Sequence, residues 1–402
     1  MPSEEVAVRP PPAKLARTEA GSRGAVAQAG RVISVVGPPY RWIQIDCRCF
    51  FVENLYVKSA DAYFTLPALD ASEAEFWAAN EGGKQHDEAE RLEIFQDVQT
   101  EARRRAAIPE LYRSNTAACA ERYRPLHTEL FPARVDADGL REGGSGPEVA
   151  IGLAAENVFN ATFLEVWRCA RDGRALPDQL RHVHDACYES PLFTRAFSER
   201  IKEELRHFKG QDLPHQRPNS MNRNGCILNE IGFGPLMDRI IGVYLLPVCR
   251  VLYPDLLEHG MDSHHSFVVD YGVGKDTSLG VHDDNSEITV NIALSEDYSG
   301  GTLALYHRAR VAHPQRLEKR PYHHRVGMGT MLLHPGELLH EVLPLTAGER
   351  QGLIIWIRSD GYRRRHGCAL CQRSDGLVYA AAATGAAAAG AAEPVRTKAA
   401  EQ

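Results

Sequence analysis

Residues 282–294 read HDDNSEITVNIAL, and residues 340–357 read HEVLPLTAGERQGLIIWI. Each stretch starts with polar, metal-binding residue types and runs into the Val- and Ile-rich texture that is typical of a strand. Working outward, similar short runs follow one another from residue 264 onward, separated by Gly-rich or Pro-rich turns and with no helical pattern between them: SFVVDYG, GGTLALYHR and GTMLLHPG. This spacing predicts a sandwich, a barrel or a double-sheet jelly roll.

Three residues in these stretches form a candidate metal site. In extended chain, residues i and i+2 face the same way, so His282 and Asp284 can face one ion while Asp283 faces away. Alone, such a pair favours the simpler interpretation of a polar turn that leads into a strand, because short motifs of this kind recur by chance. His340 changes the interpretation, because two imidazoles and one carboxylate form the facial triad that leaves open positions on Fe(II).

Arg350 lies just before the apolar run LIIWI. An Fe(II) site with a single carboxylate keeps a net positive charge, which suits a dianionic 2-oxo acid. The distant carboxylate of that acid needs a bidentate cation in a dry pocket, and a guanidinium provides one. We therefore expect Arg350 to bind the co-substrate.

The combination of these two stretches resembles the Fe(II)- and 2-oxoglutarate-dependent oxygenase superfamily, on the branch that holds prolyl 4-hydroxylases and procollagen lysyl hydroxylases. Further motifs extend the resemblance toward both ends of the chain: CRCFFVENLYV (47–57), RPNSMNRNG (217–225), LYPD (252–255) and CALCQR (368–373). The resemblance implies a double-stranded β-helix, also called a jelly roll. It also implies Fe(2+) as the metal, 2-oxoglutarate and O2 as co-substrates, and L-ascorbate as a supporting cofactor.

Carried over by position, the iron ligands of the family fall on His282, Asp284 and His340, and the cation for the far carboxylate falls on Arg350. Two further co-substrate contacts of the lysyl hydroxylase branch fall on Tyr271 and Asn291. Tyr271 has the alternative role of a buried strand aromatic. In one continuous strand, His282 and Asn291 would point to opposite faces, because side chains alternate between the faces. A bulge or loop near residues 285–286 must therefore reset the register if both side chains face the iron.

The sequence as a whole predicts four segments. Residues 1–30 read as a disordered N-terminus, and residues 31–210 as a mostly helical region with a short β segment near 31–58. Residues 211–360 form the expected jelly roll, and residues 361–402 form a basic segment with Cys368 and Cys371, followed by an Ala-rich disordered tail. The expected class is therefore α+β. For Cys368 and Cys371, free thiols or redox chemistry are favoured. A zinc site with Cys47 and Cys49 is the alternative if the two ends of the chain meet.

Composition excludes several classes of protein. The 402 residues carry 46 Lys and Arg against 53 Asp and Glu, a formal charge of -7, which disfavours generic nucleic-acid binding. No apolar stretch is long enough for a bilayer, no secretory signal is visible, and nine cysteines are an odd count for a disulfide framework. A soluble protein of the cytoplasm or nucleus is favoured, without a membrane partner.

We expect an enzyme, a 2-oxoglutarate-dependent dioxygenase that couples decarboxylation of 2-oxoglutarate to hydroxylation of a substrate. The resemblance suggests a protein or peptide substrate with a Pro or Lys side chain as the target. Two alternatives stay open: a metal-binding jelly roll that acts as a scaffold or adaptor without turnover, and a cupin-like enzyme that uses the metal without a 2-oxo acid. The intact triad together with Arg350 counts against a scaffold.

Overall fold

A computed structural model describes residues 55–60, 62–80, 86–131, 153–261, 263–306, 321–325, 327–366, 377–378 and 395–396. Contacts divide the chain into Met1–Ile33 and Ser34–Gln402, and every described residue belongs to the second unit. The expectations for residues 1–54, for both cysteine pairs and for most of the Ala-rich tail therefore lie outside the described residues.

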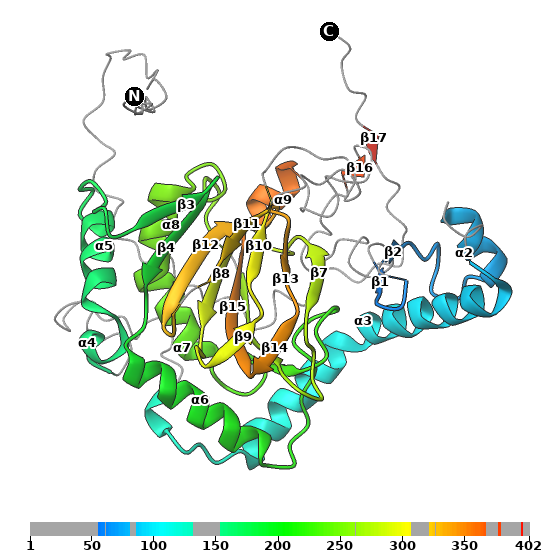
Figure 1. The fold of residues 1–402 in the computed structure, drawn as a ribbon, viewed down its shortest axis with the longest axis horizontal. Helices are drawn as coiled ribbons and strands as arrows, with labels where there is room; N and C mark the ends of the chain where they lie inside the picture. Colours follow the sequence, from blue (N-terminus) through cyan, green and yellow to red (C-terminus); the bar gives the residue numbers. More distant parts are fainter. Residues whose placement is uncertain are drawn as a thin grey trace, which may run out of the picture. The chain divides into compact units, whose positions relative to one another are not determined.

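The largest element is a seven-stranded antiparallel sheet (Figure 1). Its strands, in spatial order, are β3 (Arg181–His184), β4 (Cys187–Pro191), β12 (Thr330–Pro335), β8 (Ile288–Ala293), β15 (Arg350–Arg358), β6 (Ser263–Tyr271) and β5 (Gly225–Ile227). The five strand-like runs of the sequence all lie in strands, four of them in this sheet.

A four-stranded sheet carries the remaining run, in β10. Its order is β11 (Tyr322–His324), β10 (Leu303–Leu305), β13 (His340–Val342) and β7 (Leu279–His282). Three two-stranded pairs complete the strands: β1 (Leu55–Val57) with β2 (Ala62–Phe64), β9 (Tyr298–Gly300) with β14 (Leu345–Gly348), and β16 (Leu377–Val378) with β17 (Val395–Arg396). Of the β segment expected at 31–58, β1 is the described part.

Strand alternation separates two hydrophobic cores on the faces of the large sheet. In β15, Leu353, Ile355 and Ile357 belong to the core shared with the helices, whereas Ile354 belongs to a smaller core with Leu303 and Val342 of the four-stranded sheet. One face of the large sheet therefore packs against helices, and the other faces the second sheet.

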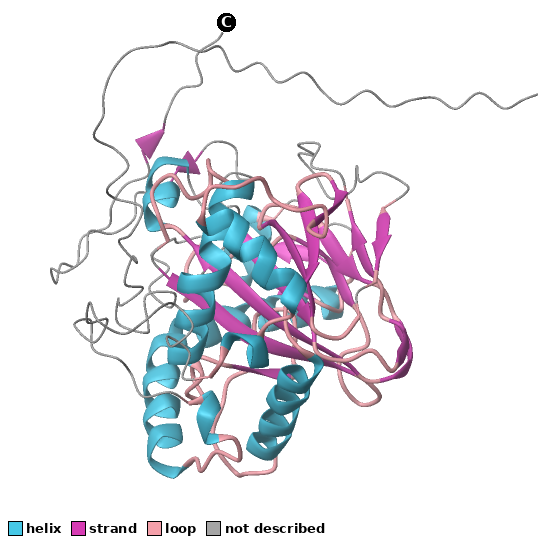
Figure 2. Cartoon of the chain, turned by 90° about the vertical axis from the view of Figure 1, so that its left-hand side faces the viewer, coloured by secondary structure: helices cyan, strands magenta, loops and turns pink. Residues whose placement is uncertain are grey.

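Helices cover the first of these faces, and they stand on one side of the strands in Figure 2. They are α4 (Ala155–Val158), α5 (Ala161–Arg171), α6 (Arg195–Lys209), α7 (Gly234–Arg239), the π-helical η5 (Ile240–Leu245) and α8 (Leu246–Leu252). The apolar stripe of α6 consists of Phe197, Ile201, Leu205 and Phe208, which are all buried. Thr194 caps this helix by accepting a hydrogen bond from Phe197 N.

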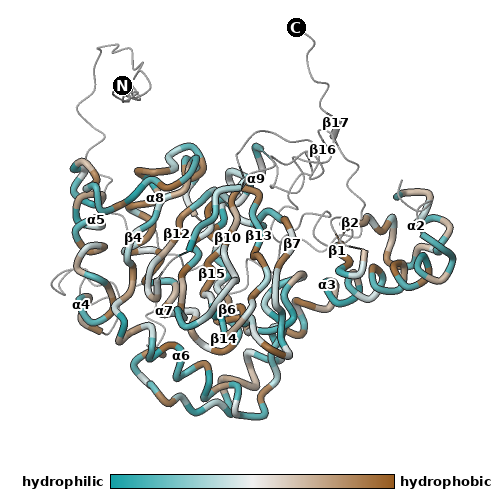
Figure 3. Tube along the Cα trace, in the orientation of Figure 1, coloured by the Kyte–Doolittle hydropathy of each residue, from teal (hydrophilic) through white to brown (hydrophobic). Residues whose placement is uncertain are grey.

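The described residues between 73 and 130 are mostly helical, as the sequence predicts. They form α2 (Glu73–Ala79), the long α3 (Glu88–Arg122) and the short η3 (Thr128–Leu130). In α3, Phe95 and Val98 are buried, whereas Leu92 is exposed. The helix is mostly hydrophilic along its length (Figure 3). After the sheet, residues 360–366 form α9 (Asp360–His366).

The segment 181–191 differs from the expected helical block. It forms the hairpin β3–β4, and β4 pairs with β12 of the large sheet. Asp185 makes the turn with a left-handed φ of 41°. The sheet therefore takes strands from residues before 211, and the boundary expected at 210/211 falls inside the set of elements that build the sheet.

Helices and large antiparallel sheets together confirm the α+β class. Within the described part of the chain, no helix has both the length and the apolar character that a membrane span requires.

Candidate metal centre

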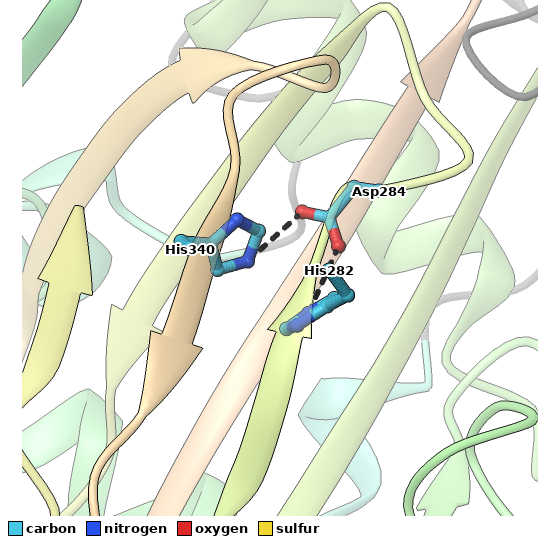
Figure 4. Close-up of side chains that lie close together, drawn as sticks. All are labelled: His282, Asp284 and His340. Carbon is cyan, nitrogen blue, oxygen red and sulfur yellow. Dashed lines mark ion pairs between the residues drawn. The ribbon is translucent and has the colours of Figure 1, made fainter. Parts of the chain in front are cut away.

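The two histidines of the expected triad lie opposite each other in one strand pair. His282 ends β7, His340 begins β13, and the antiparallel register aligns them directly. Directly opposed residues place their side chains on the same face of a sheet. Their ring centroids are 4.2 Å apart, and Figure 4 shows both rings turned toward Asp284.

Asp284 completes the cluster from the loop that follows β7. Its backbone N–H donates to Gly336 O at 2.8 Å, which fixes the loop against the turn before β13. Its Oδ1 lies 3.7 Å from His282 Nε2, and its Oδ2 lies 3.7 Å from His340 Nε2. One ligand atom of each of the three residues lies within 4.8 Å of the others, and all three side chains are buried.

Backbone carbonyls fix which nitrogen of each ring faces the cluster. His282 Nδ1 lies 2.8 Å from Gly280 O, and His340 Nδ1 lies 2.9 Å from Leu338 O. A carbonyl oxygen can only accept, so each Nδ1 must carry the proton and donate it. In the neutral form of either ring, Nε2 keeps its lone pair and faces Asp284, as a metal-binding histidine requires.

The charges around the cluster also suit a metal. Burial lowers the pKa of His282 to about 3, so its ring is neutral at pH 7. Burial by itself raises the pKa of Asp284, but the neighbouring His340, His282 and His334 rings and a hydrogen bond from Thr289 lower it by more, to below its ordinary value. Thr289 Oγ1 donates to Asp284 Oδ2 at 2.6 Å. Neutral imidazoles and an ionised carboxylate are the ligand forms that bind metals.

This donor set fits Fe(II). Two imidazole nitrogens and one carboxylate, with the rest of the coordination sphere left to other ligands, match the facial triad of non-haem iron sites. Asp283, which follows His282 directly, does not belong to the cluster.

A third histidine lies beside the cluster, although no sequence motif marks it as part of the site. His334 is completely buried, its Nε2 lies 3.9 Å from Asp284 Oδ2, and its ring centroid is 4.9 Å from that of His340. It comes from β12, and its Nδ1 lies 2.9 Å from Pro335 O. His334 therefore packs behind the carboxylate ligand.

Arg350 and Tyr271 lie opposite each other across β15 and β6. The guanidinium carbon of Arg350 is 5.1 Å from the centre of the Tyr271 ring. Asn222 Nδ2 donates to Tyr271 Oη at 3.1 Å, and burial raises the pKa of that phenol, which therefore stays protonated at pH 7. A cation and two neutral hydrogen-bonding groups thus lie close together in one buried corner.

Asn291 lies on β8, whose side chains at odd and even positions point to opposite faces. Ile288, Val290 and Ile292 point to the helices, whereas Asn291 lines the same pocket as His282. Residues 283–287 form a loop between β7 and β8. This loop provides the reset of register that the sequence requires if both residues are to face one site.

One pocket contains all six residues expected from the sequence: Tyr271, His282, Asp284, Asn291, His340 and Arg350. It comprises about 1180 Å³ of space, part of it open to solvent, and both sheets line it. Further lining residues come from the RPNSMNRNG motif, including Arg217 and Asn222, and from α3, including Arg104, Arg105 and Ile108. The motif was visible in the sequence, but α3 carried no readable sign of chemistry.

A family model described as the OGFOD2-like domain matches residues 150–258. The chain is 31% identical over 354 residues to the human protein "2-oxoglutarate and iron-dependent oxygenase domain-containing protein 2", covering 86% of this chain and 93% of that protein. It is 31% identical over 183 residues to mouse "Procollagen-lysine,2-oxoglutarate 5-dioxygenase 1", covering 42% of this chain and 23% of that one. A solved prolyl-4-hydroxylase from Pseudomonas putida aligns with a TM-score of 0.32 and 17% identity, covering 46% of this chain and 96% of its own.

Proposed function

The chain belongs to the family of 2-oxoglutarate and iron-dependent oxygenase domain-containing proteins, and from this premise we propose that it hydroxylates a Pro or Lys side chain of a protein. Decarboxylation of 2-oxoglutarate drives the reaction. The observation that carries the proposal is the cluster of His282, Asp284 and His340 in one pocket with Arg350.

We further propose that the two facing sheets form a double-stranded β-helix. The buried residues shared between them support this, since Phe267 and Ile354 of the large sheet pack with Leu303 and Val342 of the small one. The catalytic domain then begins near residue 153 and ends near 360, and the helical region before it supplies one wall of the pocket.

His282 Nε2, His340 Nε2 and one oxygen of Asp284 would hold Fe(II), and the metal would supply the activation of O2 and the oxidative decarboxylation. The protein side chains bind and orient. Hydrogen bonds from Nδ1 of both histidines to backbone carbonyls, and from Thr289 to Asp284, hold the three ligands in place. No side chain needs to act as a nucleophile.

Arg350 would pair with the far carboxylate of 2-oxoglutarate, next to the Tyr271 hydroxyl and Asn222. Asn291 would contact the same molecule from β8. Apolar residues of both sheets, Phe267, Val269, Leu303, Val342 and Ile354, line the space around it and exclude water. A requirement for L-ascorbate stays a prediction.

Turnover distinguishes an oxygenase from a metal-binding scaffold. Purified protein with Fe(II), ascorbate, O2 and a cell lysate should release succinate from 2-oxoglutarate, and mass spectrometry should find a peptide that gained one oxygen atom on Pro or Lys. Asp284→Ala is the inactive control. Wild-type protein that binds Fe(II) and 2-oxoglutarate but never exceeds this control, with any protein fraction, would support the scaffold instead.

A further inference from the structure

Helix α3 brings a cluster of arginines to the pocket of the proposed iron site. Arg104 and Arg105 lie on α3, Arg217 lies in the motif 217–225, and all three contact the single carboxylate of Glu101. Arg104 pairs with both oxygens of Glu101 at 2.9 Å, and Arg105 Nε reaches one of them at 2.9 Å. All three arginines line the pocket that contains His282 and Arg350.

The charges of this half of the pocket do not balance. In the cofactor half, Fe(II) with Asp284 and 2-oxoglutarate with Arg350 would sum to zero. On the other side of the pocket, Arg104 and Arg217 share the single carboxylate of Glu101, which Arg105 also contacts. One carboxylate balances one of these positive charges, and a partly desolvated pocket makes the excess costly unless a ligand neutralises it.

The three arginine side chains differ in their exposure to solvent. The side chain of Arg105 is 2% exposed and is therefore buried, whereas the side chains of Arg104 and Arg217 are 23% and 25% exposed. These two retain accessible surface in the pocket. Glu101 stays ionised beside them, because its arginine partners outweigh the effect of burial and lower its pKa to about 2.

Three N–H donors that line the pocket have no acceptor among the described residues: Arg217 Nε, Trp356 Nε1 and Asn285 Nδ2. The Asn285 side chain is buried and follows the ligand Asp284 directly. Buried donors without an acceptor are costly, so a bound molecule that offers oxygen acceptors here would be favoured.

On the basis of the function proposed above, we infer that the substrate is a peptide segment with an Asp or Glu close to the hydroxylated residue, and that Arg104 and Arg217 bind this carboxylate. Guanidinium groups match a carboxylate in a bidentate geometry. Ile108 and Met221 offer apolar contacts beside them, as a peptide side chain requires. The overall charge of -7 disfavours a nucleic acid as the source of the negative charge.

Fluorescence anisotropy with two pools of labelled synthetic peptides tests this inference. Both pools carry Pro or Lys at the centre, flanked in one pool by Asp and Glu and in the other by Asn and Gln. The protein is loaded anaerobically with Fe(II) and 2-oxoglutarate. We expect the acidic pool to bind about tenfold tighter or more, and Arg104→Gln or Arg217→Gln to remove about tenfold of its affinity.

Arg113→Gln is the matched control, because Arg113 lies on the exposed face of α3 and, among the described residues, forms an ion pair only with Glu110 of the same helix. It should bind the acidic pool like the wild type. Arg217→Lys keeps the charge without the planar fork, and we expect an intermediate affinity. The visible absorption band of the Fe(II)–2-oxoglutarate complex verifies that each variant keeps its pocket.

Equal binding of both pools, no binding of either, or full affinity in the Arg104→Gln and Arg217→Gln variants would overturn the inference. The wild-type comparison of the two pools needs no variant and decides the matter even if a variant fails to fold. Absence of the Fe(II)–2-oxoglutarate band in the wild type would instead contradict the proposed function itself.

Discussion

At the residue scale, the cluster owes its form to hydrogen bonds that the ligands make away from the metal. Gly280 O and Leu338 O accept from the two Nδ1 atoms, so both Nε2 atoms face Asp284. Thr289 orients the carboxylate. Partners of this kind set the orientation and basicity of metal ligands.

Replacing Arg350 separates co-substrate binding from metal binding. Arg350→Ala should weaken 2-oxoglutarate about 10- to 100-fold, because it removes a charge-assisted, bidentate contact, and should leave Fe(II) affinity unchanged. Anaerobic titration with 2-oxoglutarate at saturating Fe(II) measures the loss. Arg350→Lys should lose less. Unaltered 2-oxoglutarate affinity in Arg350→Ala would contradict this role of Arg350, and unaltered activity of the variant would favour an enzyme that uses the metal without a 2-oxo acid.

Gly336 holds the loop that carries Asp284. A Cβ added there would lie 1.9 Å from Ser286 O and 2.5 Å from Ser286 Oγ, so the loop would have to move. We expect Gly336→Ala to weaken Mn(II) binding, measured by electron paramagnetic resonance, about tenfold or more. Gly327→Ala is the control, since its Cβ would meet nothing within 4 Å. Equal Mn(II) affinity in both variants would show that the loop does not depend on Gly336.

The ligands themselves were accessible to sequence analysis, because His282 and Asp284 are close in sequence and His340 starts a strand-like run. Asn222 and Arg217 were not, although their motif was visible. Their contribution depends on how the loop at 217–225 packs against Tyr271 and α3. Contacts between residues so far apart in sequence leave no local pattern.

At the scale of elements, strand periodicity predicted the long strands and the short β10 correctly, but it missed other short strands such as β7 and β3. β8 and β15 carry their own apolar alternation, whereas β7 and β13 have three or four residues and are defined by pairing with each other. The hairpin β3–β4 is polar and forms part of the large sheet through its pairing with β12. Tertiary pairing of this kind overrides local propensity.

The long helix α3 is tied to the core by a buried polar contact. Asn115 Nδ2 donates to Glu230 Oε1 at 2.8 Å, and Gln216 supplies two further donors to this carboxylate. Burial nonetheless raises the pKa of Glu230. The contact links the helical region to the segment that leads into the motif 217–225.

Asn115→Ala should reduce the free energy of unfolding by about 1–3 kcal/mol, because it removes one donor from a buried carboxyl group. Urea denaturation measures the change. Ser114→Ala, one residue away on the exposed side of α3, should change it by no more than about 0.5 kcal/mol. If the two variants unfold at the same urea concentration, α3 does not depend on Glu230 for its attachment.

At the scale of the whole molecule, buried neutral histidines make stability depend on pH. Burial first, and then Arg358, holds the pKa of His265 well below its ordinary value. The unfolded chain binds a proton at this histidine below about pH 6.5, and the folded chain does not. Stability is therefore highest above pH 6.5 and falls as the pH drops through that value, by up to about 1.4 kcal/mol per pH unit for one group.

Urea unfolding of the metal-free protein at several pH values between neutral and mildly acidic conditions tests this dependence. His265→Asn should show a shallower loss toward acid than the wild type. The exposed His323 provides the control, and His323→Asn should leave the slope unchanged. An identical slope in the wild type and in His265→Asn would contradict the assignment of a neutral, buried His265.

The boundary between the helical region and the oxygenase domain was the feature that the sequence predicted least well. The sequence predicts a helical region without visible chemistry up to residue 210 and an oxygenase domain after it, because the motif 217–225 and the strand-like runs from residue 264 onward follow that point. The structure instead has residues 181–191 in the main sheet, and α3 supplies Arg104 and Ile108 to the pocket. Neither contact follows from periodicity, since both join segments that lie about a hundred residues or more apart.

Anaerobic titration of the metal-free protein with Fe(II) and 2-oxoglutarate tests the central claim most directly. The account predicts a weak visible charge-transfer band in the wild type, because both molecules share the site of His282, Asp284 and His340. The band should persist in His323→Ala and vanish in His282→Ala. Absence of the band in the wild type, or an undiminished band in His282→Ala, would contradict the account.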